Sequence, residues 1–278
     1  MKQGVKKRRF MGAANANVPK TAWNTSPGLR RRVRCLAFHA LLIMLCLRAI
    51  AVPSVASADT GRGYLDLSGG YKTGDFGTTT TSSLYYLSTI IGYVAPRYDV
   101  SVAVPYLSLS NKSGGSTTSE SGVGDVILRG GRVLLPEDHN GFSLDGALAV
   151  KLPTADKNKG LGTGETDYGA FLSAHLRFDK TRLSFLSGYI QVGDPPAVNY
   201  NDLYLYGVGI ARIFGSTELY ASYEGRRAMV PGAKNPQEIN VGFFHVLNAD
   251  YAIKGNTFAG LNKGGPDFGL SIGMVRWF

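Results

Sequence analysis

The side chains that could do chemistry in this sequence are few, and their spacing does not suit catalysis. Three histidines lie beyond residue 58, namely His139, His175 and His245. A phospholipase built on a membrane barrel would be expected to carry a serine two places after its histidine, but Arg177 and Leu247 follow the second and third histidines at that place. No serine–histidine pair that could activate a nucleophile can therefore be proposed from the sequence.

The sequence does not indicate thiol chemistry, a metal site or a nucleotide-binding site either. Both cysteines, Cys35 and Cys46, lie in an N-terminal segment that we expect to be removed. His175 and His245 are far apart, and no carboxylates cluster at the spacing of metal ligands. The glycine-rich residues 160–164 lack the spacing and the following helix of a nucleotide-binding motif. We predict that the chain is not an enzyme and holds no metal and no cofactor.

The first 58 residues have the pattern of an export signal. They hold eleven of the 30 Lys and Arg and none of the 20 Asp and Glu, so the net charge of +10 falls to −1 for the remainder. The apolar residues 35–47 are too few to span a bilayer as a helix, which takes about 20. Residues 56–58, Ala-Ser-Ala, suit a signal peptidase. We predict a cleaved signal peptide over residues 1–58 and a mature domain over residues 59–278. An uncleaved anchor, twin-arginine export and a nucleic-acid partner for the basic leader are weaker alternatives.

The mature domain reads as a series of strands. In residues 141–151, apolar Phe142 and Leu144 alternate with Ser143 and Asp145, which gives one apolar and one polar face. Segments of this kind are rich in Tyr, Val, Leu, Ile, Phe and Gly, the composition of strands. We expect twelve, give or take two, over residues 63–71, 82–95, 98–110, 122–135, 141–151, 165–178, 181–193, 202–214, 217–227, 237–247, 251–260 and 267–278.

The connections between these strands alternate between short and long. Six long ones are expected over residues 72–81, 111–121, 152–164, 194–201, 228–236 and 261–266, with short turns between them. Strict alternation places all long loops at one end, as in bacterial outer-membrane barrels, whose short turns and termini lie in the periplasm. A closed sheet also pairs every backbone polar group within lipid. We therefore predict an all-β fold, a single antiparallel up-and-down transmembrane β-barrel of about 12 strands in the bacterial outer membrane.

The polar faces of these strands supply the candidate functional residues. Taking that face as the lumen gives eleven charged or titratable side chains: Asp66, Asp125, Arg129, Asp145, Lys151, Asp167, His175, Arg177, Glu218, Glu224 and Arg226. They can form a constriction that selects solutes by charge, or a network of ion pairs that fills the interior. The longest loop, residues 152–164, can instead fold inward and gate a pore, with Lys157, Lys159 and Gly160 as gating candidates. Twelve strands do not decide whether the lumen is open.

The end of the chain resembles the signal by which outer-membrane barrels are recognised for assembly. The chain finishes in Phe278, and Leu270, Ile272 and Met274 alternate before it. Arg276 departs from the pattern, which usually has an aromatic or apolar residue there. The resemblance implies the barrel-assembly machinery as a partner through the C-terminal strand.

A second resemblance rests on three short motifs. Residues 122–125 (GVGD), 151–154 (KLPT) and 160–164 (GLGTG), the last followed by Asp167, resemble the outer-membrane porins described as phenol-degradation meta-pathway-like. The resemblance covers most of the mature domain and implies a barrel that serves as a conduit, one often assigned to hydrophobic or aromatic compounds; a related barrel secretes amyloid subunits. It supplies no particular solute.

We therefore expect a porin-like channel for small solutes, with outer-membrane lipid as its surroundings and no nucleic-acid partner. A non-conducting structural or adhesin-like barrel, a soluble periplasmic β-protein and a barrel enzyme acting on lipids are the alternatives. The sequence does not indicate an oligomeric state.

Overall fold

The computed structural model describes residues 61–196 and 198–278, so the predicted signal peptide lies outside the described residues. One short 3₁₀ helix, η2 (Lys157–Lys159), accompanies the strands, and no helix among the described residues is long and apolar enough to cross a membrane. The strands are β1 (Arg62–Gly74), β2 (Thr81–Val94), β3 (Tyr98–Ser113), β4 (Ser116–Val123), β5 (Val126–Leu135), β6 (Phe142–Leu152), β7 (Asp167–Phe178), β8 (Thr181–Gln191), β9 (Leu203–Phe214), β10 (Thr217–Arg226), β11 (Gln237–Val246), β12 (Tyr251–Gly260) and β13 (Phe268–Trp277).

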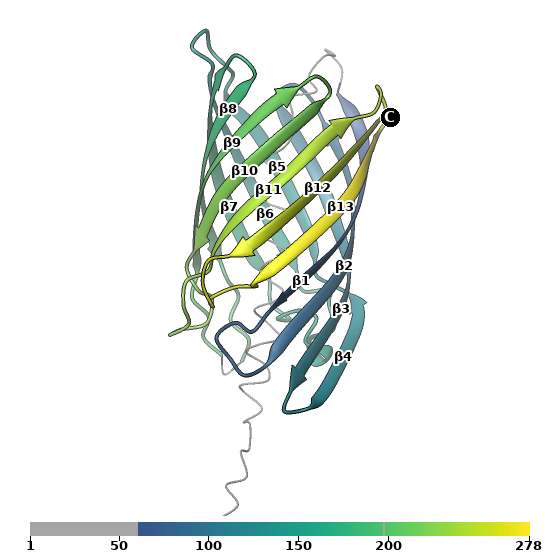
Figure 1. The fold of residues 1–278 in the computed structure, drawn as a ribbon, viewed down its shortest axis with the longest axis vertical. Coiled ribbons are helices and arrows are strands. Elements are labelled where there is room, and N and C mark those ends of the chain that lie inside the picture. The colour runs from purple at the N-terminus through teal and green to yellow at the C-terminus, as the bar shows by residue number, and fades with distance from the viewer. Residues whose placement is uncertain (1–60, 197) are drawn as a thin grey trace, which may run out of the picture.

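These strands close into an antiparallel barrel (Figure 1). Consecutive strands pair along the sheet, and β1 pairs with both β2 and β13, so the first strand joins the last. Strands β4 and β5 both pair with β3, one with its second half and the other with its first half, and together they fill one position in the wall. The wall is therefore twelve strands around, and the predicted all-β, up-and-down barrel is confirmed.

The predicted loop over residues 111–121 is wrong. Strands β3 and β4 form a hairpin there, which turns at Gly114 and Gly115 with φ of 55° and 83°, a conformation that favours glycine. The predicted strand over residues 122–135 is also broken, at Gly124 and Asp125, between β4 and β5. Strand β4 lacks the apolar alternation of a lipid-facing strand because the hairpin extends past the end of the barrel wall (Figure 1).

The alternation of long and short connections gives the barrel two different ends. Short turns join β2 to β3, β7 to β8 and β9 to β10, and the C-terminus lies at the same end (Figure 1). The connections after β6, β8 and β10 are longer and lie at the other end, together with the β3–β4 hairpin. In outer-membrane barrels the end with short turns faces the periplasm and the long loops face outward.

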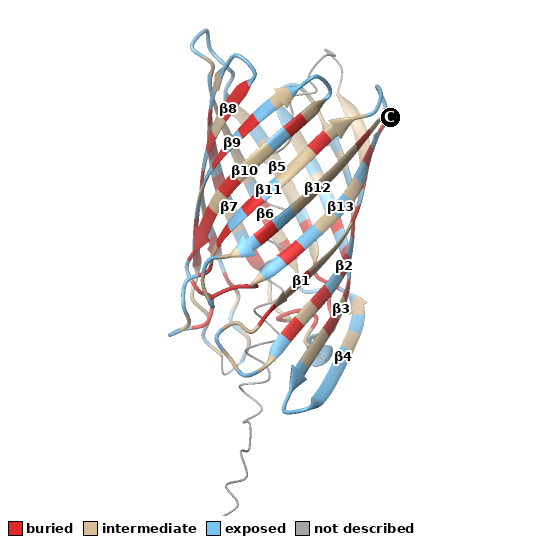
Figure 2. Cartoon of the chain, viewed as in Figure 1, coloured by how far each residue is buried: buried red, intermediate tan, exposed pale blue. Residues whose placement is uncertain are grey.

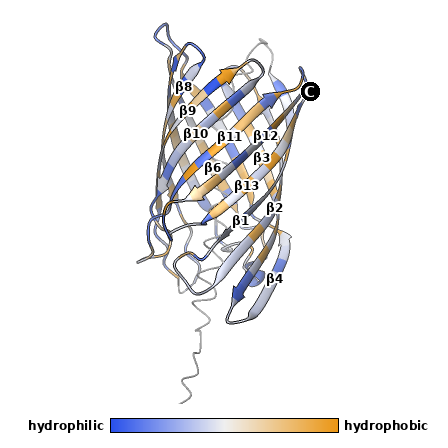
Figure 3. Cartoon of the chain, viewed as in Figure 1, coloured by the Kyte–Doolittle hydropathy of each residue, from blue (hydrophilic) through white to orange (hydrophobic). Residues whose placement is uncertain are grey.

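The outer surface of the wall is apolar. Along β2, β3, β9 and β13, buried and exposed residues alternate (Figure 2), and the exposed positions include Ile91 and Ile272, which are 63% and 65% exposed. On β6, Leu148 is 67% exposed. Apolar residues mark the strands around the barrel (Figure 3). A soluble monomer rarely exposes an apolar surface of this extent. The chain is a transmembrane β-barrel of the outer-membrane type.

Aromatic side chains on the inner face pack over glycines of neighbouring strands. A Cβ atom at Gly242 would lie 2.4 Å from the Tyr220 ring and 2.6 Å from a backbone oxygen of Gly255. A Cβ atom at Gly269 would lie 2.2 Å from the ring of Phe258. The glycines thus leave room for large rings inside a narrow cylinder, which is why they interrupt the alternation of side chains along these strands.

Candidate functional site

The structure places all eleven predicted lumen candidates on the inner face of the wall or at its rim. Arg129, Asp145 and Arg177 are partly buried, and the other eight are buried. They do not form a single ring. They gather instead in separate clusters near the two ends of the barrel, so their role in selecting solutes stays a prediction.

The first cluster surrounds Lys151 at the end with long loops. Its Nζ lies 2.8 Å from Oδ2 of Asp167 and 3.5 Å from Oδ2 of Asp125, and it donates a hydrogen bond of 2.9 Å to Thr163 Oγ1. All four residues are buried. One cation thus holds two carboxylates, an arrangement that keeps buried charges paired. These residues come from the motifs that carried the family resemblance.

The same cluster fastens the loop between β6 and β7 to the wall. The Ala155 N–H donates to Asp125 Oδ1 at 3.0 Å, and Leu161 is 1% exposed within the apolar interior. A Cβ atom at Gly162 would lie 2.7 Å from Asp125 Oδ2, so only glycine fits that close approach. Part of the loop, residues 161–163, is therefore folded inward.

The three gating candidates occupy the other part of this loop. Lys157 and Lys159 lie in η2 and are exposed, and Gly160 ends that helix in the left-handed conformation, with φ of 69°. Asp156 caps η2 by accepting hydrogen bonds from Asn158 N and Lys159 N. The lysines are thus solvated, and the residues that dock the loop, Leu161, Gly162 and Thr163, are not the predicted gating residues.

A second group of ion pairs lies toward the end with short turns. Arg182 donates to Glu218 at 2.8 Å, Arg177 to Glu137 at 2.9 Å, and Arg129 pairs with Asp99. Arg182, Glu137 and Asp99 were missed by the sequence analysis. Asp99 and Arg182 lie on strands whose polar parity was visible in the sequence, whereas Glu137 lies in a predicted turn.

A serine–histidine–carboxylate contact lies in this region, although no such pair could be proposed from the sequence. His175 Nδ1 lies 2.9 Å from Ser184 Oγ, and His175 Nε2 lies 3.2 Å from Asp145 Oδ2. Adjacent strands explain the contact, since His175 and Ser184 are register partners on β7 and β8. Ser184 is only 2% exposed. The backbone N–H groups of these strands are engaged in the sheet ladder, which leaves them no part in an oxyanion hole.

The third cluster lies on β1, β10 and β11 at the end with long loops. Glu224 and Glu238 are register partners on the inner face, and Arg226 Nη1 lies 3.9 Å from Glu238 Oε2. Lys72 Nζ lies 5.5 Å from the centre of the Phe258 ring. Lys72 was not predicted because it lies where a loop was expected. Glu238 was not predicted because no inner-face residues were assigned on its strand. Lys254, which pairs with Asp66, was missed in the same way.

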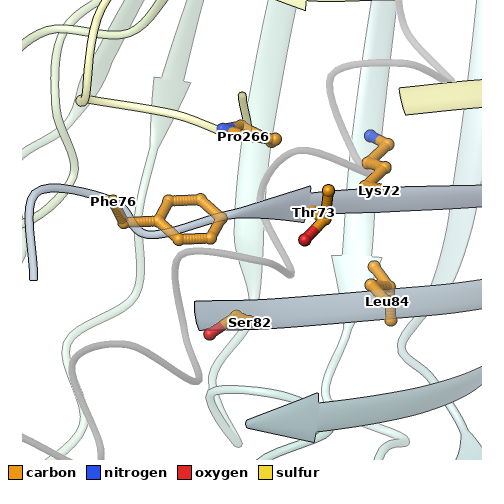
Figure 4. A pocket seen from close by; sticks show the side chains of 6 residues that line it. All are labelled: Lys72, Thr73, Phe76, Ser82, Leu84 and Pro266. Atoms are coloured by element: carbon orange, nitrogen blue, oxygen red, sulfur yellow. The ribbon is translucent and has the colours of Figure 1, made fainter. Parts of the chain in front are cut away.

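Lys72 also borders a small cavity of about 10 Å³, enough for one water molecule. Figure 4 shows its lining, with Lys72 and Thr73 at the end of β1, Ser82 and Leu84 on β2, and Phe76 and Pro266 from two loops.

Apolar side chains fill much of the rest of the interior. Leu107, Ile190 and Leu203 are 1%, 0% and 1% exposed and belong to one cluster of buried apolar side chains. That cluster spans β2, β3 and β5 to β9, whereas the polar residues of the third cluster lie on β1, β10 and β11. A second apolar cluster, Phe244, Ala252, Val275 and Trp277, lies on β11 to β13, so apolar and polar patches lie next to one another around the inner face.

Solved structures share this architecture. An outer membrane channel from Pseudomonas putida F1 matches with a TM-score of 0.66 and 15% identity, over 82% of this chain and 100% of that chain. The translocator domain of the autotransporter NalP from Neisseria meningitidis matches at 0.54 and 11% identity, over 87% and 97%. The KdgM porin matches at 0.50 and 10% identity, over 77% and 99%. At these identities the similarity concerns the fold.

No curated protein matches the sequence. Residues 63–206 match the family described as "Putative MetA-pathway of phenol degradation". The matched region is more than half of the 278 residues and runs from β1 to β9. It contains the Lys151 cluster and the docked loop, so the motifs behind the resemblance build one structural feature. The chain belongs to this family, as the resemblance predicted, and it is a barrel of the bacterial outer membrane.

Proposed function

We propose that this barrel is a channel that conducts small solutes across the outer membrane. The observation that carries the proposal is a closed, lipid-facing wall whose inner face bears charges of both signs. Among the described residues, Glu224 Oε2 and Asn240 Nδ2 are buried and have no hydrogen-bond partner. Buried polar atoms are normally satisfied by protein or water, so these atoms favour a lumen that holds water or solute.

The charges of the inner face predict weak ion selectivity. Carboxylates and cations are almost equally represented, with Asp66, Asp99, Asp125, Asp145, Asp167, Glu218, Glu224 and Glu238 against Lys72, Arg129, Lys151, Arg177, Arg182, Arg226 and Lys254. Strong selectivity for anions or cations comes from rings of one sign. Neutral solutes with an apolar part fit this inner face best, because they can contact its apolar patches and hydrogen-bond to its polar ones.

A solute-uptake assay tests this proposal. Liposomes that contain the folded protein should swell in an iso-osmotic solution of a small neutral solute, such as glycerol or a pentose, faster than liposomes without protein. A larger oligosaccharide should give no swelling. Equal rates with and without folded protein would contradict a conducting lumen.

The partners of the barrel follow from its location. The wall requires outer-membrane lipid, and the C-terminal strand is the candidate contact for the barrel-assembly machinery. Phe278 is 62% exposed, and its N–H donates to the Gly63 oxygen at 3.0 Å, which completes the seam between β13 and β1. We also propose that export removes residues 1–58, so that N-terminal sequencing of the membrane-inserted protein begins at Asp59.

We propose a conduit without enzymatic activity. The contact of Ser184, His175 and Asp145 is the observation that favours the enzyme alternative. Its serine is buried and lacks backbone donors for an oxyanion, so a histidine that hydrogen-bonds to its neighbours in the interior wall accounts for the contact. Labelling of Ser184 by a serine-reactive probe distinguishes a barrel enzyme from a conduit.

A further inference from the structure

Two arginines lie side by side at the rim of the barrel with short turns. Arg97 is in the turn between β2 and β3, and Arg132 is on β5, opposite Tyr98 in the sheet register. The backbone joins the two segments, because the Val133 N–H donates to the Arg97 oxygen at 2.9 Å. The fold therefore holds the two side chains at one place.

This place is on the outer surface, at the height of the membrane interface. Arg132 shares the outward parity of β5 with Leu128 and Leu134, which are 39% and 47% exposed, whereas Ile127 points inward and is buried. Next to it, the exposed rings of Tyr93 and Tyr98 lie 6.2 Å apart. Aromatic residues at strand ends mark the interface of outer-membrane barrels, and short turns mark the periplasmic side.

A hollow of about 270 Å³ opens between the two arginines, lined by Arg97, Arg132, Val133, Leu134 and Pro136. Two cationic side chains and three apolar residues thus border the same hollow. That combination suits an amphipathic anion whose charged group meets the guanidinium groups and whose apolar part lies against Leu134 and Pro136.

Neither arginine has an anionic partner among the described residues. The carboxylates nearest to them in the sequence, those of Asp99 and Glu137, pair with Arg129 and Arg177 instead. Every other arginine on a described strand is placed in an ion pair, in a hydrogen bond or over an aromatic ring. Two neighbouring guanidinium groups repel each other, and an anion that lies between them offsets this repulsion. A guanidinium fork binds phosphate with two parallel hydrogen bonds.

We propose that Arg97 and Arg132 form a binding site for the phosphate group of an anionic phospholipid in the periplasmic leaflet. The glycerol and the first carbons of the acyl chains would lie along Leu134 and Pro136. The site faces away from the lumen, so it is independent of conduction.

Native mass spectrometry of the folded protein in a non-ionic detergent tests the site. The protein is titrated with dioleoylphosphatidylglycerol, with dioleoylphosphatidylcholine and with inorganic phosphate. Wild-type protein should bind one phosphatidylglycerol at least about tenfold more tightly than phosphatidylcholine. In the double variant Arg97→Gln/Arg132→Gln this preference should disappear, since hydrogen bonds to charged groups of this kind are worth about tenfold or more.

A matched control removes two other arginines from the same end. Arg212 and Arg276 are exposed and lie over Phe214 and Tyr251, respectively, and so Arg212→Gln/Arg276→Gln changes the net charge equally. This variant should keep the preference for phosphatidylglycerol. The variant Arg97→Lys/Arg132→Lys keeps the positive charges but loses the planar guanidinium groups. It should bind phosphatidylglycerol with intermediate affinity.

Three results would overturn the proposal. Equal binding of the two lipids by wild-type protein would show that no anionic headgroup is recognised. An equal loss in the control variant would assign the effect to general surface charge. Inorganic phosphate that binds as tightly as the lipid would make the site one for a free anion. Each preparation is first checked for a folded band in an unheated gel, and solute uptake by the double variant should equal that of wild type.

Discussion

Lys151 and Asp167 face each other across β6 and β7, with Nζ 2.8 Å from Oδ2, and this ion pair fixes the base of the longest loop of the barrel. Both residues are register partners at the strand ends that flank the loop. Asp125 joins them from the break between β4 and β5 and binds the loop backbone at Ala155. The loop is therefore anchored to three wall segments by one buried charge cluster.

Replacing the central cation should release this loop. In Lys151→Met, Asp125 and Asp167 stay buried without their cation, and breaking a buried pair in this way costs about 3–5 kcal/mol. The loop should detach before the strands separate, because its release lets water reach the carboxylates of Asp125 and Asp167. Trypsin cleavage after Lys157 or Lys159, followed by mass spectrometry, should become at least about tenfold faster. Arg177→Gln at the other end is the control, and equal cleavage in both variants would contradict the anchoring role.

Shortening the loop should change the flow through the barrel. Deleting residues 157–160 removes the exposed turn with η2 and pulls on the docked residues 161–163, while the strand ladder stays intact. We expect a higher single-channel conductance or fewer closures, with an unchanged folded band in an unheated gel. Unchanged conductance would remove the gating role of Lys157, Lys159 and Gly160 and leave the channel itself untouched.

Glycines under aromatic rings should be sensitive to a single methyl group. Gly242→Ala and Gly269→Ala would place Cβ within 2.6 Å of a backbone oxygen and 2.2 Å of the Phe258 ring, respectively. Overpacking of this kind costs about 1–3 kcal/mol. Gly130→Ala is the control, because no atom lies within 4 Å of its Cβ. Unfolding in guanidinium, followed by the heat-dependent gel shift, should show lower midpoints for the first two variants only.

Much of this fold was predictable because lipid imposes a simple pattern. Each wall strand must show an apolar face outward, so alternation marked the strands in residues 141–151 and 217–227, and the short turns between strands were equally clear. The β3–β4 hairpin escaped detection since it extends past the wall, where no lipid demands an apolar face. Its serine- and threonine-rich sequence therefore reads as a loop.

The site was predictable only in part. Parity alone placed Lys151, Asp125 and Asp167 on the inner face, but it could not show that they meet, because they lie on three different elements. The parity of a strand position predicts which face a side chain lies on, but not which residue it contacts. The contact between His175 and Ser184 could be predicted only from the register of β7 and β8. Lys72 was not predicted as an inner-face residue because the first strand was predicted to end before it, at residue 71.

The contact of Ser184 with His175 gives a direct test of catalysis. A fluorophosphonate probe labels serines that are activated by a neighbouring base and accessible to the reagent. We expect no labelling of Ser184 in folded protein, because the side chain is 2% exposed and lacks an oxyanion hole from the backbone. The variant Ser184→Ala should conduct like wild type. Stoichiometric labelling that Ser184→Ala abolishes would favour a barrel enzyme.

Conduction across a planar lipid bilayer tests the central claim most directly. The purified, folded protein without residues 1–58 should insert in discrete current steps. Under a salt gradient the reversal potential should stay close to that of a non-selective pore, because the inner face carries carboxylates and cations in nearly equal number. Folded protein that inserts but passes no current, also after deletion of residues 157–160, would contradict the channel and assign the function to the loops or the lipid-facing wall.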